Sequence, residues 1–282
     1  MESSKNTYFY IEHLNGSEAV VSELFENYVQ AMWWGEEHTL FGIILEGMEG
    51  KLETDFLAIK NSLKLEKASL HFTDVIDQEE YQIPFPFTIE PFYITTINSY
   101  STIPEDLIPI YLDAESAFGS GEHETTATCI QEIVEICDTP ISSALDIGCG
   151  TGVLSLAIAL LSQAKVYASD IDTNAVLSAK KNCTLNQVSN IEVLLADGLN
   201  HPKIQSNAPF DLVVANIHAN PLCNLAGAIS SVLRPGSTVV ISGFLSDQKD
   251  QVNRCFLEKG LSIISEVQRG NWCTTVFHRL SH

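Results

Sequence analysis

The chain has 282 residues, of which 45% are hydrophobic, and its mean hydropathy is +0.09. These values predict a globular protein with more than one typical domain and fewer than three, and they exclude a disordered chain. No apolar run is long enough to span a membrane, and residues 1–5 do not begin a secretory signal. We therefore expect a cytoplasmic protein that makes no membrane contact.

The formal net charge is −21, and it is spread unevenly. Residues 1–110 hold 19 acidic side chains against five lysines, and residues 111–282 hold 17 against 10 lysines and arginines. Such an acidic surface repels a phosphate backbone, so we expect no stable nucleic-acid binding. It would attract and steer a basic protein partner, although a simple contribution to solubility explains the charge equally well.

The cysteines predict neither a disulfide framework nor a structural zinc site. Their number is odd, and no two of them form a C-x-x-C pair. We expect small, reduced and mostly buried side chains. They are Cys129, Cys137, Cys149, Cys183, Cys223, Cys255 and Cys273.

Residues 1–85 predict a small α+β domain of ferredoxin-like type. Apolar spacing indicates strands over 8–11, 39–45 and 70–76, and helices over 17–32 and 51–63. This domain contains no recognisable catalytic motif. Its second helix is expected to bury Leu52, Phe56, Leu57 and either Ile59 or Leu63.

Residues 86–110 are predicted to form a linker, because prolines interrupt regular structure there. Only residues 92–97 have the composition of a strand. From residue 111 to 282, strand and helix patterns alternate, and a hairpin is expected around Gly270-Asn271. This alternation predicts an α/β domain with a mostly parallel sheet and helices on both faces.

A glycine-rich segment over 143–152 is the strongest candidate site. A buried strand runs into Asp146, and Gly148, Gly150 and Gly152 then turn the chain into a helix. Glycine is needed where the backbone bends sharply and a ligand approaches it closely. The third glycine comes one residue too early for a dinucleotide fingerprint, and no lysine follows as in a P-loop. Asp146 would suit the ammonium group of an amino-acid-bearing cofactor, directly or through water.

Acidic residues also end the next two predicted strands. Asp170 closes the strand over 165–170, where a carboxylate can accept both ribose hydroxyls. Asp172 is better explained as a helix N-cap. Asp197 stands where it would meet an adenine amino group, with a solvated loop aspartate as the alternative.

The strand over 210–216 ends in Asn216, at the edge where open α/β sheets bind ligands. The side-chain oxygen of an asparagine there can accept a hydrogen bond from an amine of the substrate, while the backbone holds the NH₂ group of the same side chain. This side chain is our candidate catalytic residue.

Three segments resemble the ribosomal protein methyltransferases of the PrmA type, and the resemblance covers roughly residues 85–282. Residues 117–126 are similar to the family's A-F-G-T-G-x-H-x-T-T, and residues 216–222 are close to its N-I-x-A-N-P-L. Residues 146–152 resemble motif I of class I S-adenosylmethionine methyltransferases. The resemblance implies a Rossmann-like seven-stranded sheet and methylation of protein eleven of the large ribosomal subunit. It also implies that residues 1–85 recognise the substrate.

The resemblance implies a set of cofactor contacts for S-adenosylmethionine and its product S-adenosylhomocysteine. They are Thr126, Gly148, Asp170 and Asn216, with Phe118 in a loop that closes over the cofactor. The glycine motif and the strand pattern add Gly150 and Asp197 to the candidate contacts. From the residues alone, Thr125 or Thr126 would cap a helix running to Cys137. His123 lies between two glutamates, but the H-E-x-x-H pattern is missing, so we expect no metal.

The chain departs from the family pattern at Glu115, Glu124 and Asn271, which leaves substrate detail open. Our leading hypothesis is a monomeric enzyme that methylates lysine ε-amines of a basic ribosomal protein, with the terminal α-amine as a further acceptor. One alternative is an N-methyltransferase for another protein, a small molecule or RNA, with the negative charge counting against RNA. The other is a methyltransferase-like binding module without activity.

Overall fold

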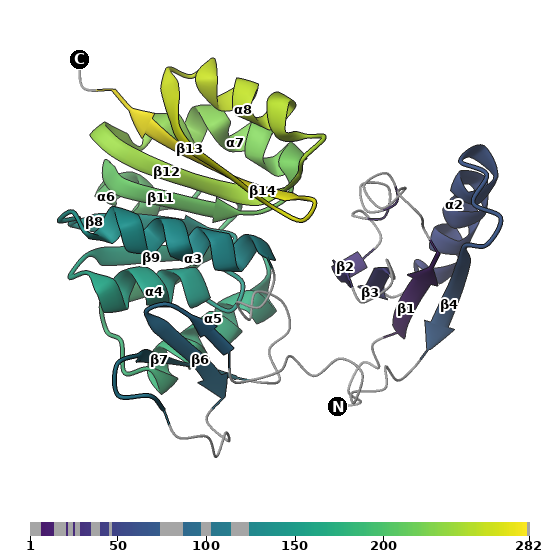
Figure 1. The fold of residues 1–282 in the computed structure, drawn as a ribbon, viewed down its shortest axis with the longest axis horizontal. Helices are drawn as coiled ribbons and strands as arrows, with labels where there is room; N and C mark the ends of the chain where they lie inside the picture. Colours follow the sequence, from purple (N-terminus) through teal and green to yellow (C-terminus); the bar gives the residue numbers. More distant parts are fainter. Residues whose placement is uncertain are drawn as a thin grey trace. The chain divides into compact units, whose positions relative to one another are not determined.

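The computed structural model describes residues 7–13, 21, 25, 29–34, 40–44, 47–73, 87–96, 103–113 and 124–280. The chain divides into two compact units, Met1–Gln82 and Ile83–His282, which are described separately (Figure 1). Phe118, His123 and Glu115 lie outside the described residues. Each helix in the described part is too short or too polar to cross a membrane.

The first unit is a four-stranded antiparallel sheet with the order β2-β3-β1-β4. This interleaved order agrees with the ferredoxin-like arrangement predicted from the sequence. The sheet and helix α2 enclose a core that includes Phe9, Leu40, Leu52 and Phe56. The elements are β1 (Thr7–Glu12), β2 (Val29–Trp34), β3 (Leu40–Ile44), α2 (Glu49–Ser62) and β4 (Ser69–Thr73).

Two expectations for this unit are wrong in part. The helix predicted over 17–32 cannot extend through residues 29–32, because β2 occupies them and pairs with β3. Val and Trp favour strands, and the cross-strand pairing overrides the helical spacing. In helix α2, Ile59 is buried, which fulfils the prediction of Ile59 or Leu63, but Leu57 is 52% exposed.

The second unit is built on a seven-stranded sheet with the order β10-β9-β8-β11-β12-β14-β13. Strands β8 to β12 are parallel to one another, and β14 is antiparallel to both β12 and β13. The predicted class I methyltransferase sheet and its terminal hairpin are therefore confirmed. The strands are β8 (Ser143–Ile147), β9 (Lys165–Asp170), β10 (Ile191–Leu195), β11 (Phe210–Asn216), β12 (Leu233–Leu245), β13 (Leu261–Arg269) and β14 (Trp272–Arg279).

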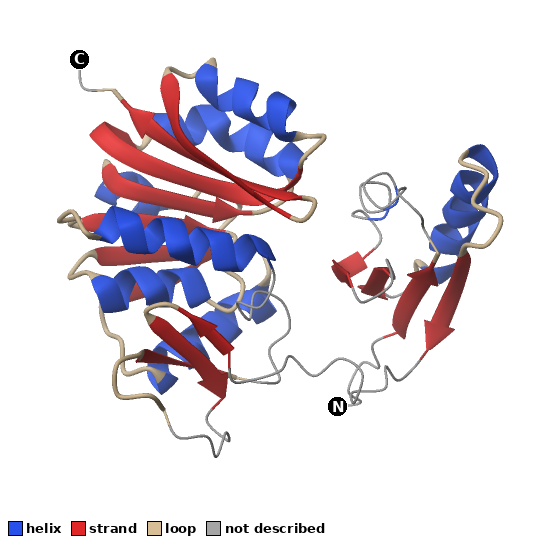
Figure 2. Cartoon of the chain, in the orientation of Figure 1, coloured by secondary structure: helices blue, strands red, loops and turns tan. Residues whose placement is uncertain are grey.

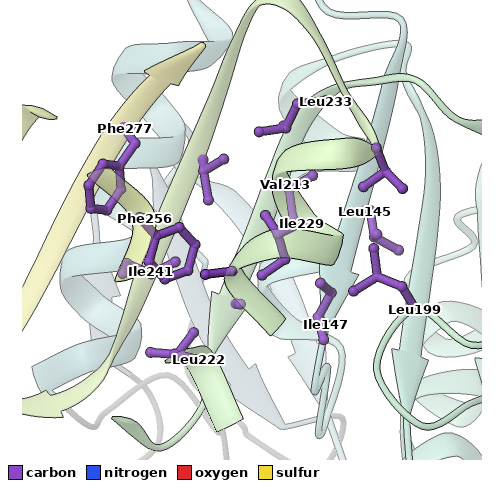
Figure 3. Close-up of a cluster of buried hydrophobic side chains, with 14 of the residues drawn as sticks. Leu145, Ile147, Leu199, Val213, Leu222, Ile229, Leu233, Ile241, Phe256 and Phe277 are labelled. Carbon is purple, nitrogen blue, oxygen red and sulfur yellow. The ribbon is translucent and has the colours of Figure 1, made fainter. Parts of the chain in front are cut away.

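Helices cover both faces of this sheet (Figure 2). Side chains alternate along each strand, so Val213 packs under α7 and α8 whereas Leu212 and Val214 pack against α3 and α4. Figure 3 shows the first of these two cores, where Leu222, Ile229 and Phe256 meet the sheet. The helices are α3 (Glu124–Cys137), α4 (Val153–Leu161), α5 (Thr173–Leu185), α6 (Pro202–Asn207), α7 (Ala219–Ser231) and α8 (Lys249–Leu257).

The linker predicted over 86–110 is instead mostly folded into the second unit. Strands β5 (Phe87–Ile89), β6 (Phe92–Thr96) and β7 (Ile108–Leu112) form a three-stranded sheet. Phe92, Ile94 and Ile110 are buried in the same core as α3 and α4. The prolines mislead because Pro91 lies in the turn before β6 and Pro104 lies in the connection before β7, so neither of them interrupts a strand.

Candidate functional site

The candidate site lies at the carboxyl edge of the seven-stranded sheet. Strands β9, β8 and β11 are adjacent and parallel, so the segments that follow them emerge at the same edge. The structure therefore brings together the glycine turn after β8, Asp170 at the end of β9 and Asn216 at the end of β11. One turn and two residues that are far apart in the sequence therefore lie at the same sheet edge, as the strand pattern predicts.

The turn after β8 has a backbone shape that only glycine adopts readily. Gly148, Gly150 and Gly152 have φ angles of 70°, 52° and 80°. The N–H of Gly148 donates to the carbonyl oxygen of Ser169 at 2.8 Å, which ties the turn to β9. A Cβ on Gly148 would lie 2.3 Å from Cγ2 of Ile217, so this position also lacks room for a side chain.

Asp170 is held rigidly by two backbone donors. Its Oδ2 accepts the N–H of Gly150 at 2.9 Å, and its Oδ1 accepts the N–H of Asp172 at 2.9 Å. Each carboxylate oxygen can accept more than one hydrogen bond, so the group can also receive a pair of hydroxyls. Asp172 is the N-cap of α5, as predicted, and its side chain accepts the N–H of Asn174.

Asp146 is a buried carboxylate with a vacant acceptor. It is fully buried, and Oδ2 accepts the hydroxyl of Ser155 at 2.6 Å. Its Oδ1 is buried and has no hydrogen-bond partner within the described part of the chain. Burial raises the pKa of Asp146 to about 6 against the lowering effect of Ser155, and the charge of Asp170 raises it further. An N–H donor or a cation at Oδ1 would relieve this arrangement.

Replacing Asp146 with asparagine is expected to change how stability depends on pH. The folded-state pKa of about 6 lies above the ordinary value of 3.8. The folded chain therefore holds a proton on Asp146 that the unfolded chain releases in this range, and the contribution of Asp146 to stability falls as pH rises from about 4 to 6. The wild type should lose about 2 kcal/mol more than Asp146→Asn between these pH values. Urea unfolding of the ligand-free proteins at both pH values measures this difference, and parallel pH profiles would contradict it.

Asn216 is oriented by a side chain from helix α3. Its Nδ2 donates to Oγ1 of Thr126 at 3.3 Å, and Thr126 is 2% exposed. With the amide nitrogen directed at Thr126, Oδ1 is left to accept a hydrogen bond at the site. The holding partner is thus a hydroxyl rather than the backbone expected from the sequence. Thr125 and Thr126 are not caps, because α3 already begins at Glu124.

The third acidic candidate lies further from strand structure than predicted. Strand β10 ends at Leu195, and exposed Asp197 follows it in a turn where its carbonyl accepts the N–H of Asn200 at 3.0 Å.

Ile171, which follows Asp170 directly, is 69% exposed. Sequence reasoning missed this apolar surface, although an isoleucine directly after the acid was a visible signal. It offers a flat ligand apolar contact beside the carboxylate.

A metal site finds no support in the part of the chain that the structure describes, where no group of three or more His, Cys, Asp or Glu side chains converges. Burial makes most of the cysteines poorly reactive, because it disfavours the thiolate form. Desolvation raises the pKa values of Cys137 and Cys183 to about 11, and it raises that of Cys149 well above its ordinary range.

Comparisons with known proteins agree with this geometry. A family model described as ribosomal protein L11 methyltransferase (PrmA) matches residues 51–280. The ribosomal protein L11 methyltransferase of Brucella abortus (strain S19) is 42% identical over 167 residues, which are 58% of this chain and 59% of that protein. That of Chelativorans sp. (strain BNC1) is 40% identical over 169 residues, 59% of this chain and 58% of that protein. The chain thus spans less than two thirds of the length of these relatives.

One solved structure extends the comparison to the fold. The ribosomal protein L11 methylase from Lactobacillus delbrueckii subsp. bulgaricus superposes with a TM-score of 0.64 at 26% sequence identity. The match covers 70% of this chain and 99% of that one.

Proposed function

Because the chain belongs to the ribosomal protein L11 methyltransferase (PrmA) family, we propose that it transfers methyl groups from S-adenosylmethionine to ribosomal protein L11. The acceptors are lysine ε-amines, with the terminal α-amine as a further candidate. The observation that supports this most is the meeting of the glycine turn, Asp170 and Asn216 at one sheet edge. The products are the methylated amine and S-adenosylhomocysteine.

The residues at this edge fit the parts of the cofactor. The carboxylate of Asp170, fixed by two backbone N–H groups, would accept the ribose hydroxyls. The unpartnered Oδ1 of Asp146 would accept the cofactor's ammonium, directly or through water. Gly148 and Gly150 let the backbone approach the ligand. Asp197 and Ile171 would contact the adenine, one through its amino group and the other through its face.

Thr126 and Asn216 would position the acceptor amine. The bound cofactor supplies an electrophilic methyl group on a sulfonium, and the attacking amine must be neutral. A free lysine amine has a pKa of about 10.4, so desolvation in the site has to favour the neutral form. Oδ1 of Asn216 would accept an N–H of that amine and direct its lone pair at the methyl carbon. The amine nitrogen would form its bond to the methyl carbon as the carbon–sulfur bond breaks, and water would take the released proton.

Charge supports a basic protein as the substrate. Residues 1–110 carry 19 acidic side chains against five lysines, so the N-terminal region would attract a basic ribosomal protein. We propose that the first unit recognises that protein while the second unit carries the reaction. A monomer and the absence of stable nucleic-acid binding belong to the same proposal.

Replacing Asn216 with alanine is expected to lower kcat by about 10²-fold, because the amine loses its positioning contact. The exposed Asn224 on helix α7 offers a control, since Asn224→Ala should leave kcat unchanged. Methylation of purified ribosomal protein L11 by labelled S-adenosylmethionine, followed by mass spectrometry, measures the rate. A full rate in Asn216→Ala would contradict this role.

The same assay on wild-type chain tests the substrate. Whole-methyl mass increments on ribosomal protein L11 are expected. Increments only on a different protein would contradict the proposed substrate, and a chain that transfers no methyl group to any ribosomal protein would contradict the proposed reaction.

A further inference from the structure

We infer that Asn182, on helix α5, is a positioning residue that fixes the shape of the glycine turn for cofactor binding. Its side chain is completely buried, with 0% exposed. The Nδ2 group donates to the carbonyl oxygen of Thr151 at 2.9 Å. The Oδ1 atom accepts the N–H of Asp113 at 2.9 Å. One amide thus joins the glycine turn to the end of strand β7, and this inference rests on the cofactor site proposed above.

The chemistry of the two partners requires an amide at this position. The carbonyl of Thr151 only accepts and the N–H of Asp113 only donates, which leaves one orientation for the Asn182 side chain. An aspartate would direct a carboxylate oxygen at the carbonyl of Thr151. An apolar side chain would leave a buried acceptor and a buried donor unpaired.

The carbonyl of Thr151 is a sensitive part of the turn. It follows Gly150, whose N–H binds Asp170, and it precedes Gly152, whose φ is +80° at the start of α4. Holding this carbonyl restricts the peptide plane between Thr151 and Gly152. Glycine-rich backbone loses much conformational freedom when it is ordered, so a turn that is already fixed binds its ligand with a smaller entropic cost.

Packing shows that helix α5 shapes the turn closely. A Cβ on Gly152 would lie 3.2 Å from Cβ of Ala179, one turn before Asn182 on the same helix. Helix α5 also forms an ion pair through Lys181 with Asp113, the residue that follows strand β7.

The chain contains a matched control one helical turn further on. Asn186 accepts the N–H of Tyr111 at 2.8 Å and donates to the carbonyl of Tyr111 at 2.7 Å. It therefore binds the backbone of β7 much as Asn182 does. Within the described residues, the side chain of Asn186 bonds to the backbone of Tyr111 and to the carbonyl of Asn182, and it makes no hydrogen bond to the glycine turn.

Calorimetric titration of the full chain with S-adenosylhomocysteine tests the inference. We expect Asn182→Ala to raise the Kd by at least about tenfold, and Asn186→Ala to change it by less than about twofold. Both variants are expected to lower the unfolding temperature, which is recorded for each protein. Asn182→Ser, which is smaller and polar, replaces Asn182→Ala if the alanine variant does not fold.

Several results would overturn the inference. A folded Asn182 variant that binds as tightly as wild type would do so, and so would an equal loss of affinity in Asn186→Ala, which would indicate a general loosening of β7. The wild-type titration is made first, because a wild type that binds no cofactor contradicts the proposed function and this inference together. If the wild type binds S-adenosylhomocysteine and the Asn182 variant has the same Kd, the inference about Asn182 is contradicted and the proposed function is not.

Discussion

Gly243→Ala is expected to destabilise the second unit by about 3 kcal/mol or more and to abolish methyl transfer. Gly243 has a φ of +91°, and a Cβ there would lie 2.5 Å from the carbonyl oxygen of Ile217 and 2.8 Å from its carbonyl carbon. These are backbone atoms, which cannot turn aside as a flexible side chain can. Ile217 follows Asn216 directly, so any relief of the clash displaces the candidate catalytic residue.

Gly260→Ala is a control that measures the effect of backbone strain without a steric clash. Its φ is +81°, but a Cβ at Gly260 would meet nothing within 4 Å. Gly260→Ala should therefore cost only about 1–2 kcal/mol, the penalty for a left-handed conformation in a residue with a side chain. Urea unfolding of both variants measures the two effects. If Gly243→Ala were no less stable than Gly260→Ala, the close packing of β12 against Ile217 would be contradicted.

Asp170→Asn is expected to raise the Kd for S-adenosylmethionine by at least about 10²-fold. The substitution removes the charge that strengthens hydrogen bonds from ribose hydroxyls. It also places an amide NH₂ against a backbone donor, because the N–H groups of Gly150 and Asp172 both point at the carboxylate. An asparagine can accept only one of them well, so the glycine turn loses its contact or the loop after β9 does.

Asp172→Ala provides the matched control for Asp170→Asn. Asp172 is exposed and caps helix α5 through the N–H of Asn174. Its loss should lower stability by about 1 kcal/mol and leave the Kd within a few-fold of wild type. Calorimetry at one ionic strength compares the three proteins. Equal affinity in wild type and Asp170→Asn would remove Asp170 from the cofactor site.

The strands that carry the site were predictable because their sequences are unambiguous. Strands β9 and β11 have the predicted limits, since each has a buried central run and ends in the polar residue that the sequence singled out, Asp170 or Asn216. The sequence around β2 contains no comparable signal for where the strand begins. Val29 continues a helical spacing, and only the pairing of β2 with β3 decides its structure.

Sequence patterns could not predict the contacts within the site, because these contacts join residues that are distant in the chain. The hydroxyl of Thr126 meets the amide of Asn216 although 90 positions separate them. The bond from Asn182 to Thr151 depends on how α5 packs on the turn after β8. No local pattern encodes either contact. Cofactor contact by Phe118 stays a prediction, because this residue lies outside the described part of the chain.

A crystal structure of the chain with S-adenosylhomocysteine tests the central claim most directly. We predict density at the carboxyl edge of the sheet, with the ribose on Asp170, the amino group toward Asp146 and the sulfur facing Asn216. A ligand bound away from the glycine turn, or bound there with its ribose away from Asp170, would contradict the site proposed for this family member.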